Sequence, residues 1–393
     1  MPHPPSSGFR PSLRALSTLL LLAAGGCTDP YLPEVAKSPP SYLVVDGFLN
    51  SQGPTSVKLT RTYAIGAAGP APVEARAAVY VEEENGPRTL LREAPAGTYS
   101  SPTALTFNPA RRYRLHLNTA GGKEYASDFV PVKNTPPIDE LSWRADADGL
   151  SISLSTHDPA NAARYYRWNY VETWQIDPIY SPQVEYRPNT LPLPDITVVF
   201  PTKCWASAPS TTVLLANTTP LSQDVVTDRL LRQVPSTSER LHSGYSILVQ
   251  QQALTKEEFA YWELLRKNTE NIGSLFDAQP AQLTGNVHCL SNSTEPVLGF
   301  VGAHSVTEKR LFVARRELPA AWLAPSGYEA CYPPDTLWLA MDPLISLQSF
   351  FGNGSILPIE KVSDHNETGY TAQTRDCIDC RTRGTSVKPS FWP

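Results

Sequence analysis

The sequence predicts a mainly β protein, and three observations support this prediction. Apolar and polar residues alternate over short segments separated by turn residues, which is typical of β-strands. The 393 residues include 38 prolines, about twice the usual share, and proline is excluded from helix interiors and central strands. Only one segment has a strong helical pattern. We therefore expect an N-terminal Ig-like β-sandwich, then a second β-rich domain with one inserted α-helix.

The first predicted domain covers residues 41–133. Its expected strands lie at Tyr42–Phe48, Ser56–Tyr63, Ala77–Glu82, Thr98–Tyr99, Leu105–Phe107 and Tyr113–Leu117. Turn signals such as Glu84-Asn85-Gly86-Pro87 separate them. The sequence Asn-Thr-Pro-Pro over 134–137 then marks a break before a second domain, residues 138–393.

The second predicted domain contains the longest aromatic strand, residues 164–174. One face of this strand carries Tyr166, Trp168, Tyr170 and Trp174. The layout resembles a fibronectin type III or Ig-like domain, an architecture that hosts many functions. Exposed Trp and Tyr suit stacking on sugars or anchoring a protein partner, whereas a β core needs the same residues. We favour the core interpretation and keep a ligand or partner contact as the alternative.

One helix is predicted at about residues 255–268. Thr255 is a good N-cap, and Glu258 three residues later completes a capping box. Leu254 and Phe259 have the spacing of a hydrophobic staple. Because strands flank this segment, we expect the helix to pack on a sheet as an insertion.

The amino terminus has the three parts of a bacterial export signal. Arg10 and Arg14 provide positive charge, Ala15–Ala24 is a short apolar run, and Gly25 and Gly26 are the small residues that a signal peptidase needs. A helix that spans a bilayer needs about 20 apolar residues, so this run is too short to be one.

Cys27 follows the two glycines directly. A lipobox places the cysteine that receives diacylglycerol at this position, although Ala24 stands where Leu or Val is commoner. We predict that residues 1–26 are removed, that Cys27 is lipid-anchored, and that residues 27–40 form a Pro-rich tether. The alternative is an ordinary secretory signal in which Cys27 is incidental.

The remaining cysteines are predicted to form structural disulfides, because an exported protein lives where disulfides persist. They are Cys204, Cys289, Cys331, Cys377 and Cys380. Their odd number allows at most two bridges and leaves one thiol. Cys331 is a candidate partner for one member of the Cys377–Cys380 pair, and Cys204 for Cys289. A zinc site or a redox role of the CxxC motif are alternatives that lack supporting context.

No recognised catalytic motif is present: the sequence lacks GxSxG, HExxH, a phosphate loop and a dinucleotide fingerprint. His157, His242 and His304 are scattered, and Asp376 and Asp379 suit surface or capping roles as well as acid–base work. We therefore assign no catalytic residue, metal ligand or cofactor. A net charge of −5 without basic clusters argues against nucleic-acid binding.

Five segments resemble the DUF4249 family of Bacteroidetes lipoproteins. They are YLVVDGFLN (Tyr42–Asn50), YSILVQQQALTKEEFAYWELL (Tyr245–Leu265), GSLFDAQPAQLTGNVHCLS (Gly273–Ser291), VLGFVGAHSVTEKR (Val297–Arg310) and CIDCRTRGTSVKPSFW (Cys377–Trp392). The tail is the most specific of them, although Gly384-Thr385 stands where the family often has two glycines. The resemblance brings no catalytic residues with it. It implies an outer-membrane lipoprotein encoded beside, and working with, a TonB-dependent receptor.

The expected function is therefore that of a lipid-anchored accessory binding or assembly partner of a TonB-dependent transporter. Confinement to one membrane surface raises the effective concentration of two partners, so a weak interface suffices. The body faces either the periplasm or the cell exterior. An envelope hydrolase acting on glycans or peptides, and a passive surface scaffold or adhesin, are the alternatives.

Overall fold

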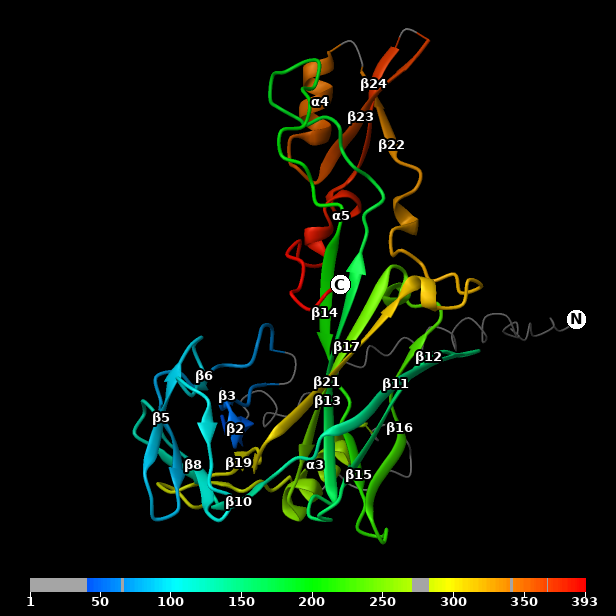
Figure 1. Ribbon diagram of the computed structural model, residues 1–393. Coiled ribbons are helices and arrows are strands. Elements are labelled where there is room, and N and C mark those ends of the chain that lie inside the picture. Colours follow the sequence, from blue (N-terminus) through cyan, green and yellow to red (C-terminus); the bar gives the residue numbers. More distant parts are fainter. Residues whose placement is uncertain (1–40, 65–66, 271–282, 340–341, 366) are drawn as a thin grey trace, which may run out of the picture.

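The computed structural model describes residues 41–64, 67–270, 283–339, 342–365 and 367–393. The predicted signal sequence, Cys27 and the tether lie outside these residues. The described chain is mainly β and elongated, with three parts (Figure 1): a barrel, a central pair of sheets, and an apical unit at the far end. None of the described helices is long and apolar enough to cross a lipid bilayer.

The first part is a closed β-barrel of eight strands. In hydrogen-bonded order they are β10 (Val130–Lys133), β20 (Ala303–His304), β1 (Leu43–Asn50), β3 (Ser56–Arg61), β6 (Thr98–Ser100), β5 (Arg88–Glu93), β4 (Ala78–Glu83) and β8 (Arg112–Asn118). Further short strands flank the ring: β2 (Gln52–Gly53), β7 (Leu105–Thr106), β9 (Glu124–Ser127), β18 (Val287–Cys289) and β19 (Val297–Leu298). The interior is apolar because alternate side chains point inward, as Val57 and Leu59 do on β3 and Val79 and Val81 on β4.

Strand β20 closes this ring. It runs parallel to both of its neighbours, with Ala303 opposite Leu49 of β1 and Val132 of β10. Strand β8 pairs again with β10, which leaves the ring without a free edge. Beside this closure, the backbone N–H of Thr135 donates to the hydroxyl of Ser305, 170 positions along the chain.

The predicted succession of Ig-like β-sandwich domains is therefore wrong, although the mainly β class is confirmed. Strand alternation looks the same in a sandwich and in a small barrel, since both have one buried face per strand. The two architectures differ in whether the two edge strands of the sheet pair with each other. Here they meet through residues 303–304, which the sequence analysis assigned to the second domain.

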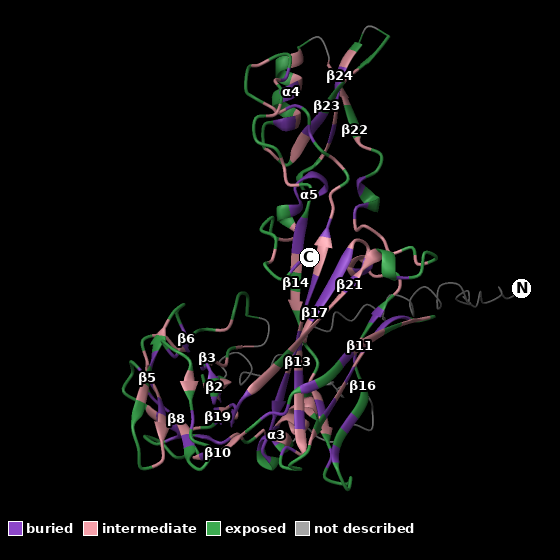
Figure 2. Cartoon of the chain, viewed as in Figure 1, coloured by how far each residue is buried: buried purple, intermediate pink, exposed green. Residues whose placement is uncertain are grey.

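Two antiparallel sheets form the central part. One contains β11 (Ile138–Asp146), β12 (Gly149–Asp158) and β16 (Asp224–Pro235); the other contains β14 (Cys204–Pro209), β13 (Tyr165–Ile176), β17 (Gly244–Ala253), β21 (Val306–Ala314) and β15 (Leu214–Asn217). They share one core, in which Leu150, Ile152 and Leu154 of β12 are joined by Trp168 and Tyr245 of the other sheet. Figure 2 shows buried residues along these strands and mostly exposed residues at the loop tips.

The predicted helix is confirmed as α3 (Lys256–Glu270). The Thr255 hydroxyl accepts the backbone N–H of Glu258 at 3.1 Å, as expected of an N-cap. Phe259 contacts the ring of Tyr165 on β13, with ring centroids 5.1 Å apart. The helix thus packs on the central sheet, near the barrel (Figure 1).

The apical unit combines two distant segments. It contains β22 (Asp335–Trp338), α4 (Pro343–Phe351), β23 (Ile356–Asp364) and β24 (Glu367–Thr374), crossed by residues 178–200 from the long connection between β13 and β14. Helix α4, which the sequence analysis missed, begins where the Asp342 side chain accepts the N–H of Ile345. The crossing segment is fixed by the Tyr370 hydroxyl, which accepts the N–H of Leu193 at 2.9 Å.

Short helical turns complete the chain. They are η1 (Glu239–Leu241), η2 (Arg315–Glu317), η3 (Glu329–Cys331), α5 (Arg375–Ile378) and η4 (Cys380–Thr382). The last two form the base of the apical unit and contain both cysteines of the CxxC motif.

Candidate functional site

Two disulfides fasten the base of the apical unit. Cys204, the first residue of β14, is bonded to Cys380, and Cys331 is bonded to Cys377. The predicted pairing of Cys331 with a member of the CxxC motif is confirmed, whereas Cys204 pairs with Cys380 and not with Cys289. Each CxxC sulfur is therefore bonded to a partner elsewhere in the chain, and the two cysteines of the motif are not bonded to each other.

Cys289 is the remaining thiol. It is buried in the barrel on β18 and has no disulfide partner within the described residues. Its neighbour His288 lies on the opposite face of the strand and approaches the carboxylate of Asp128 at 3.2 Å. Strand alternation therefore places the Cys289 thiol and the His288 ring on opposite faces of β18.

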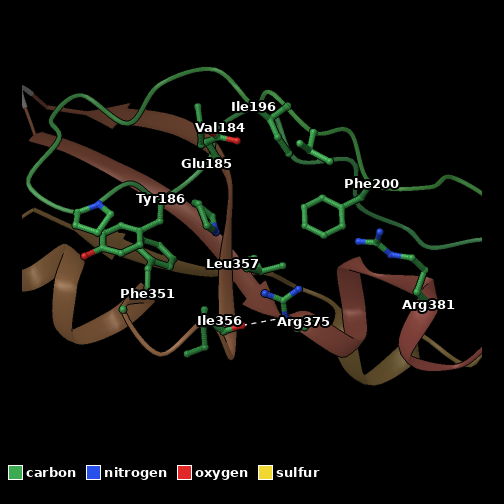
Figure 3. A pocket seen from close by; sticks show the side chains of 15 residues that line it. Val184, Glu185, Tyr186, Ile196, Phe200, Phe351, Ile356, Leu357, Arg375 and Arg381 are labelled. Carbon is green, nitrogen blue, oxygen red and sulfur yellow. Dashed lines mark hydrogen bonds between the residues drawn. The ribbon is translucent and has the colours of Figure 1, made fainter.

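The apical unit contains a pocket of about 450 Å³, which is our candidate functional site. We call it the apical pocket. Its walls come from the crossing segment, from the end of α4, from β23 and from the turns around the CxxC motif. Figure 3 shows Tyr186 and Phe351 at one end, with ring centroids 6.0 Å apart, and the guanidinium groups of Arg375 and Arg381 at the other, beside Phe200.

The disulfides position the polar end of the apical pocket. Arg375 stands two residues before Cys377, and Arg381 directly follows Cys380. On the opposite wall, Phe200 lies four residues before Cys204, so one disulfide links the segment that carries Phe200 to the turn that carries Arg381. The Arg381 guanidinium carbon lies 5.6 Å from the Phe200 ring centroid.

Asp379 holds both guanidinium groups in place. Arg381 donates two hydrogen bonds to this carboxylate, at 2.7 and 2.9 Å, and Arg375 approaches it at 3.7 Å. These hydrogen bonds from Arg381 lower the pKa of Asp379 and raise that of Arg381. Two cations share one carboxylate, so this end of the pocket has a net positive charge. About half of each arginine side chain remains exposed, which leaves donors available to a ligand.

The pocket's own acidic residue is Glu185. Its carboxylate is bonded to Arg187 and accepts the backbone N–H of Thr197 at 3.0 Å. The Thr197 hydrogen bond is the main cause that lowers the pKa of Glu185. Since Arg187 neutralises this carboxylate, the apical pocket combines apolar walls with one uncompensated positive charge. Such a site suits an apolar molecule that carries one anionic group.

The aromatic residues predicted on β13 lie in the core. Tyr166, Trp168 and Tyr170 are buried, and Trp174 is half-buried beneath the guanidinium of Arg240. Their polar atoms are satisfied internally: the Tyr166 hydroxyl donates to Asp224 at 2.9 Å, and the Trp168 indole donates to Gln251 at 2.8 Å. Tyr166, Trp168 and Tyr170 are therefore core residues, and Trp174 is partly covered.

The histidines named in the sequence analysis lie beside polar groups of the protein itself. His157 lies 2.8 Å from the carboxylate of Asp139, and His242 lies 2.9 Å from the carbonyl oxygen of Ala324. Asp379 is occupied by the two arginines, as described above. His304 is fully buried, and its Nε2 lies 3.5 Å from the carboxylate of Glu258.

Residues 28–310 match the model of the family described as "Domain of unknown function (DUF4249)". The chain belongs to the DUF4249 family. The match covers the barrel, the crossing segment and the central sheets as far as residue 310, within β21. The C-terminal tail that carries the CxxC motif lies outside it. A comparison with curated proteins found no match.

Arg375, Arg381 and Phe200 were not predicted as binding residues. The tail was interpreted only from its cysteines, although the two arginines flank the CxxC motif directly. A usable signal was the apolar alternation of Ile196, Val198 and Phe200 just before Cys204, because a disulfide brings the neighbours of both cysteines together.

Proposed function

We propose that this protein is an outer-membrane lipoprotein, anchored through Cys27, that binds an apolar anionic ligand as the accessory partner of a TonB-dependent transporter. The observation that supports a binding role most strongly is the apical pocket, with apolar walls and the guanidinium groups of Arg375 and Arg381 at one end. The transporter and the membrane remain part of the proposal, since they derive from the family resemblance and the amino-terminal sequence.

The arrangement of the chain fits this role. The strand β1 begins at Leu43, soon after the proposed anchor, so the barrel lies next to the membrane end. The apical unit is at the other end of the elongated body (Figure 1). The 14 residues of the proposed tether, 27–40, reach at most about 50 Å, so this tether would keep the barrel near the lipid.

A matched pair of small molecules tests the binding role. The probes are 2-naphthoate, an aromatic anion, and 2-naphthol, its neutral counterpart at pH 7. Binding to the full chain held in amphipol is followed by calorimetry. We expect 2-naphthoate to bind at least about tenfold more tightly, since a charge-assisted hydrogen bond contributes about 1.5–3 kcal/mol.

Substitution of the two arginines locates this preference. The double variant Arg375→Gln/Arg381→Gln should bind both probes equally, while Arg316→Gln, an exposed arginine outside the pocket, should behave as the wild type. Equal affinity of the wild type for the two probes, or an unchanged preference in the double variant, would contradict the proposed ligand class.

The anchor and the transporter need separate measurements. Intact mass analysis of native protein should show an acylated Cys27 as the first residue, and an unmodified thiol there would refute the anchor. Co-purification in mild detergent at native expression should recover a TonB-dependent receptor. Repeated recovery of the lipoprotein alone would refute the partnership and leave the binding result standing.

A further inference from the structure

A second pocket lies where the barrel, the central sheet and helix α3 meet. We call it the junction pocket. Its volume is about 280 Å³, and its walls come from β1 and β3 of the barrel, from β13 and β17, and from α3. The pocket therefore lies far along the body from the apical unit (Figure 1) and shares no lining residue with the apical pocket.

Buried polar atoms without partners are concentrated around the junction pocket. In the described part of the chain, ten buried side-chain nitrogen or oxygen atoms have no hydrogen-bond partner, and six of them belong to five residues here. These residues are Arg167, Gln252, Glu258, Trp262 and His304. Leaving a buried polar atom unpaired costs about 1–3 kcal/mol, so such a concentration calls for an explanation.

Four of these five residues line the pocket itself. The unpaired donors are Nε of Arg167 and the indole N–H of Trp262, and the unpaired acceptors are Oε1 of Gln252 and Oε2 of Glu258. Gln252 and Glu258 are each 2% exposed, so their unpaired oxygens are held away from bulk water. A ligand in this pocket must therefore offer both acceptors and donors.

The fold keeps the Glu258 carboxylate free of a strong partner. A Cβ atom at position 302 would lie 2.1 Å from Oε2 of Glu258, so only Gly302 leaves room for this carboxylate. Its other oxygen, Oε1, lies 3.5 Å from Nε2 of the His304 ring. His304 is fully buried and stacks on Phe48, with ring centroids 4.4 Å apart, which fixes the back wall of the site.

The opposite charge is supplied by Arg167. Its guanidinium carbon lies 3.5 Å from the ring centroid of Trp262, and burial lowers the pKa of Arg167 to about 10. At neutral pH the group is still a cation. The pocket thus holds one buried carboxylate and one partly desolvated guanidinium, with Asp46 and Lys58 as a second pair of opposite charges at its barrel wall.

We propose that the junction pocket binds a small zwitterion of the free α-amino-acid class. The ligand carboxylate would accept hydrogen bonds from Arg167 and Trp262, and the ligand ammonium would donate to Glu258 and Gln252. Sugars also offer donors and acceptors, but they are usually held against an open aromatic face. Here the guanidinium of Arg167 covers the face of Trp262 and leaves its N–H edge.

Calorimetry on the full chain in detergent micelles tests this proposal. The probes are the twenty common L-amino acids, with acetate, methylamine and glucose as partial or competing chemistries. We expect at least one amino acid to bind with a Kd below about 1 mM, and acetate and methylamine to bind at least about tenfold more weakly because each satisfies only half of the site.

Variants then assign the binding to these residues. Glu258→Gln should weaken amino-acid binding at least about tenfold, while Glu257→Gln, an exposed neighbour on the same helix, should have no effect. Trp262→Phe keeps an aromatic ring beneath Arg167 and removes only the N–H donor. It should also weaken amino-acid binding, and it tests the proposal if Glu258→Gln does not fold. Binding of glucose in place of amino acids, no binding of any amino acid, or equal affinities of the variants and the wild type would overturn the proposal.

Discussion

The barrel surrounds a core of twenty buried residues, and each strand of its ring has a hydrogen-bonded neighbour on both sides. The apical unit has a three-stranded sheet, one helix on it and a core of six buried residues. The barrel ring contains no disulfide, whereas two disulfides fasten the base of the apical unit. Small cores supply too little burial to be stable alone, and covalent links offset this deficit.

The barrel and the apical unit also differ in what their long-range links do. In the barrel, long-range strand pairing closes a surface and satisfies the backbone. In the apical unit, the same links that stabilise the small core also hold Arg375, Arg381 and Phe200 around one pocket. We therefore expect the barrel and the apical unit to be destabilised by different substitutions.

Removal of both disulfides should have the largest effect. In the chain-entropy relation, the 176-residue and 46-residue separations correspond to about 5 and about 4 kcal/mol. Replacing Cys204, Cys331, Cys377 and Cys380 by Ala should expose the amides of β24 to hydrogen exchange and leave those of β4 protected. The control is Cys289→Ala, which removes the thiol in the barrel. Equal loss of protection in both regions would contradict the comparison.

A substitution at Gly299, between β19 and the ring-closing strand β20, should destabilise the barrel instead. Gly299 has φ +129°, and a Cβ atom there would lie 2.1 Å from the carbonyl oxygen of Val45. We expect Gly299→Ala to reduce the free energy of unfolding by about 2–4 kcal/mol and to lower the melting temperature of the barrel. Gly121→Ala, where the nearest atom is 3.9 Å away, is the matched control and should be neutral. Similar melting curves for the two variants would argue against this closure.

Acid should change the free energy of unfolding the least of the three perturbations, through Asp379 at the base of the apical unit. The pKa of Asp379 is lowered in the folded state by its hydrogen bonds with Arg381. The stabilisation is therefore fully present above the unfolded value of about 3.9 and is lost as the pH falls through the lower folded value. Asp379→Asn should remove this pH dependence, and we expect less than about 1 kcal/mol because the arginines are half exposed. Melting curves from about pH 2 to pH 6 check this, and an unchanged acid dependence in the variant would contradict it.

Local features of the fold could be predicted from the sequence. The mainly β class follows from strand alternation, and α3 follows from the Thr255 cap and its helical spacing. The pairing of Cys331 with a CxxC cysteine could also be predicted, because the chain contains few cysteines that could serve as partners.

Long-range features could not be predicted in the same way. Strand β20 has two residues and no periodicity of its own, yet it decides between a barrel and a sandwich. Helix α4 has nine residues and is mostly apolar, so it resembles a strand in the sequence. Both candidate pockets join residues from distant segments, and nothing local in Arg167 or Arg381 indicates the partner across the pocket.

A titration of 2-naphthoate into oxidised and reduced full-length protein tests the central claim most directly, namely that the disulfides build the apical binding site. We predict that reduction weakens 2-naphthoate binding at least about tenfold and leaves the hydrogen-exchange protection of the barrel unchanged. Equal affinity before and after complete reduction, verified by mass, would show that the site does not depend on the disulfides.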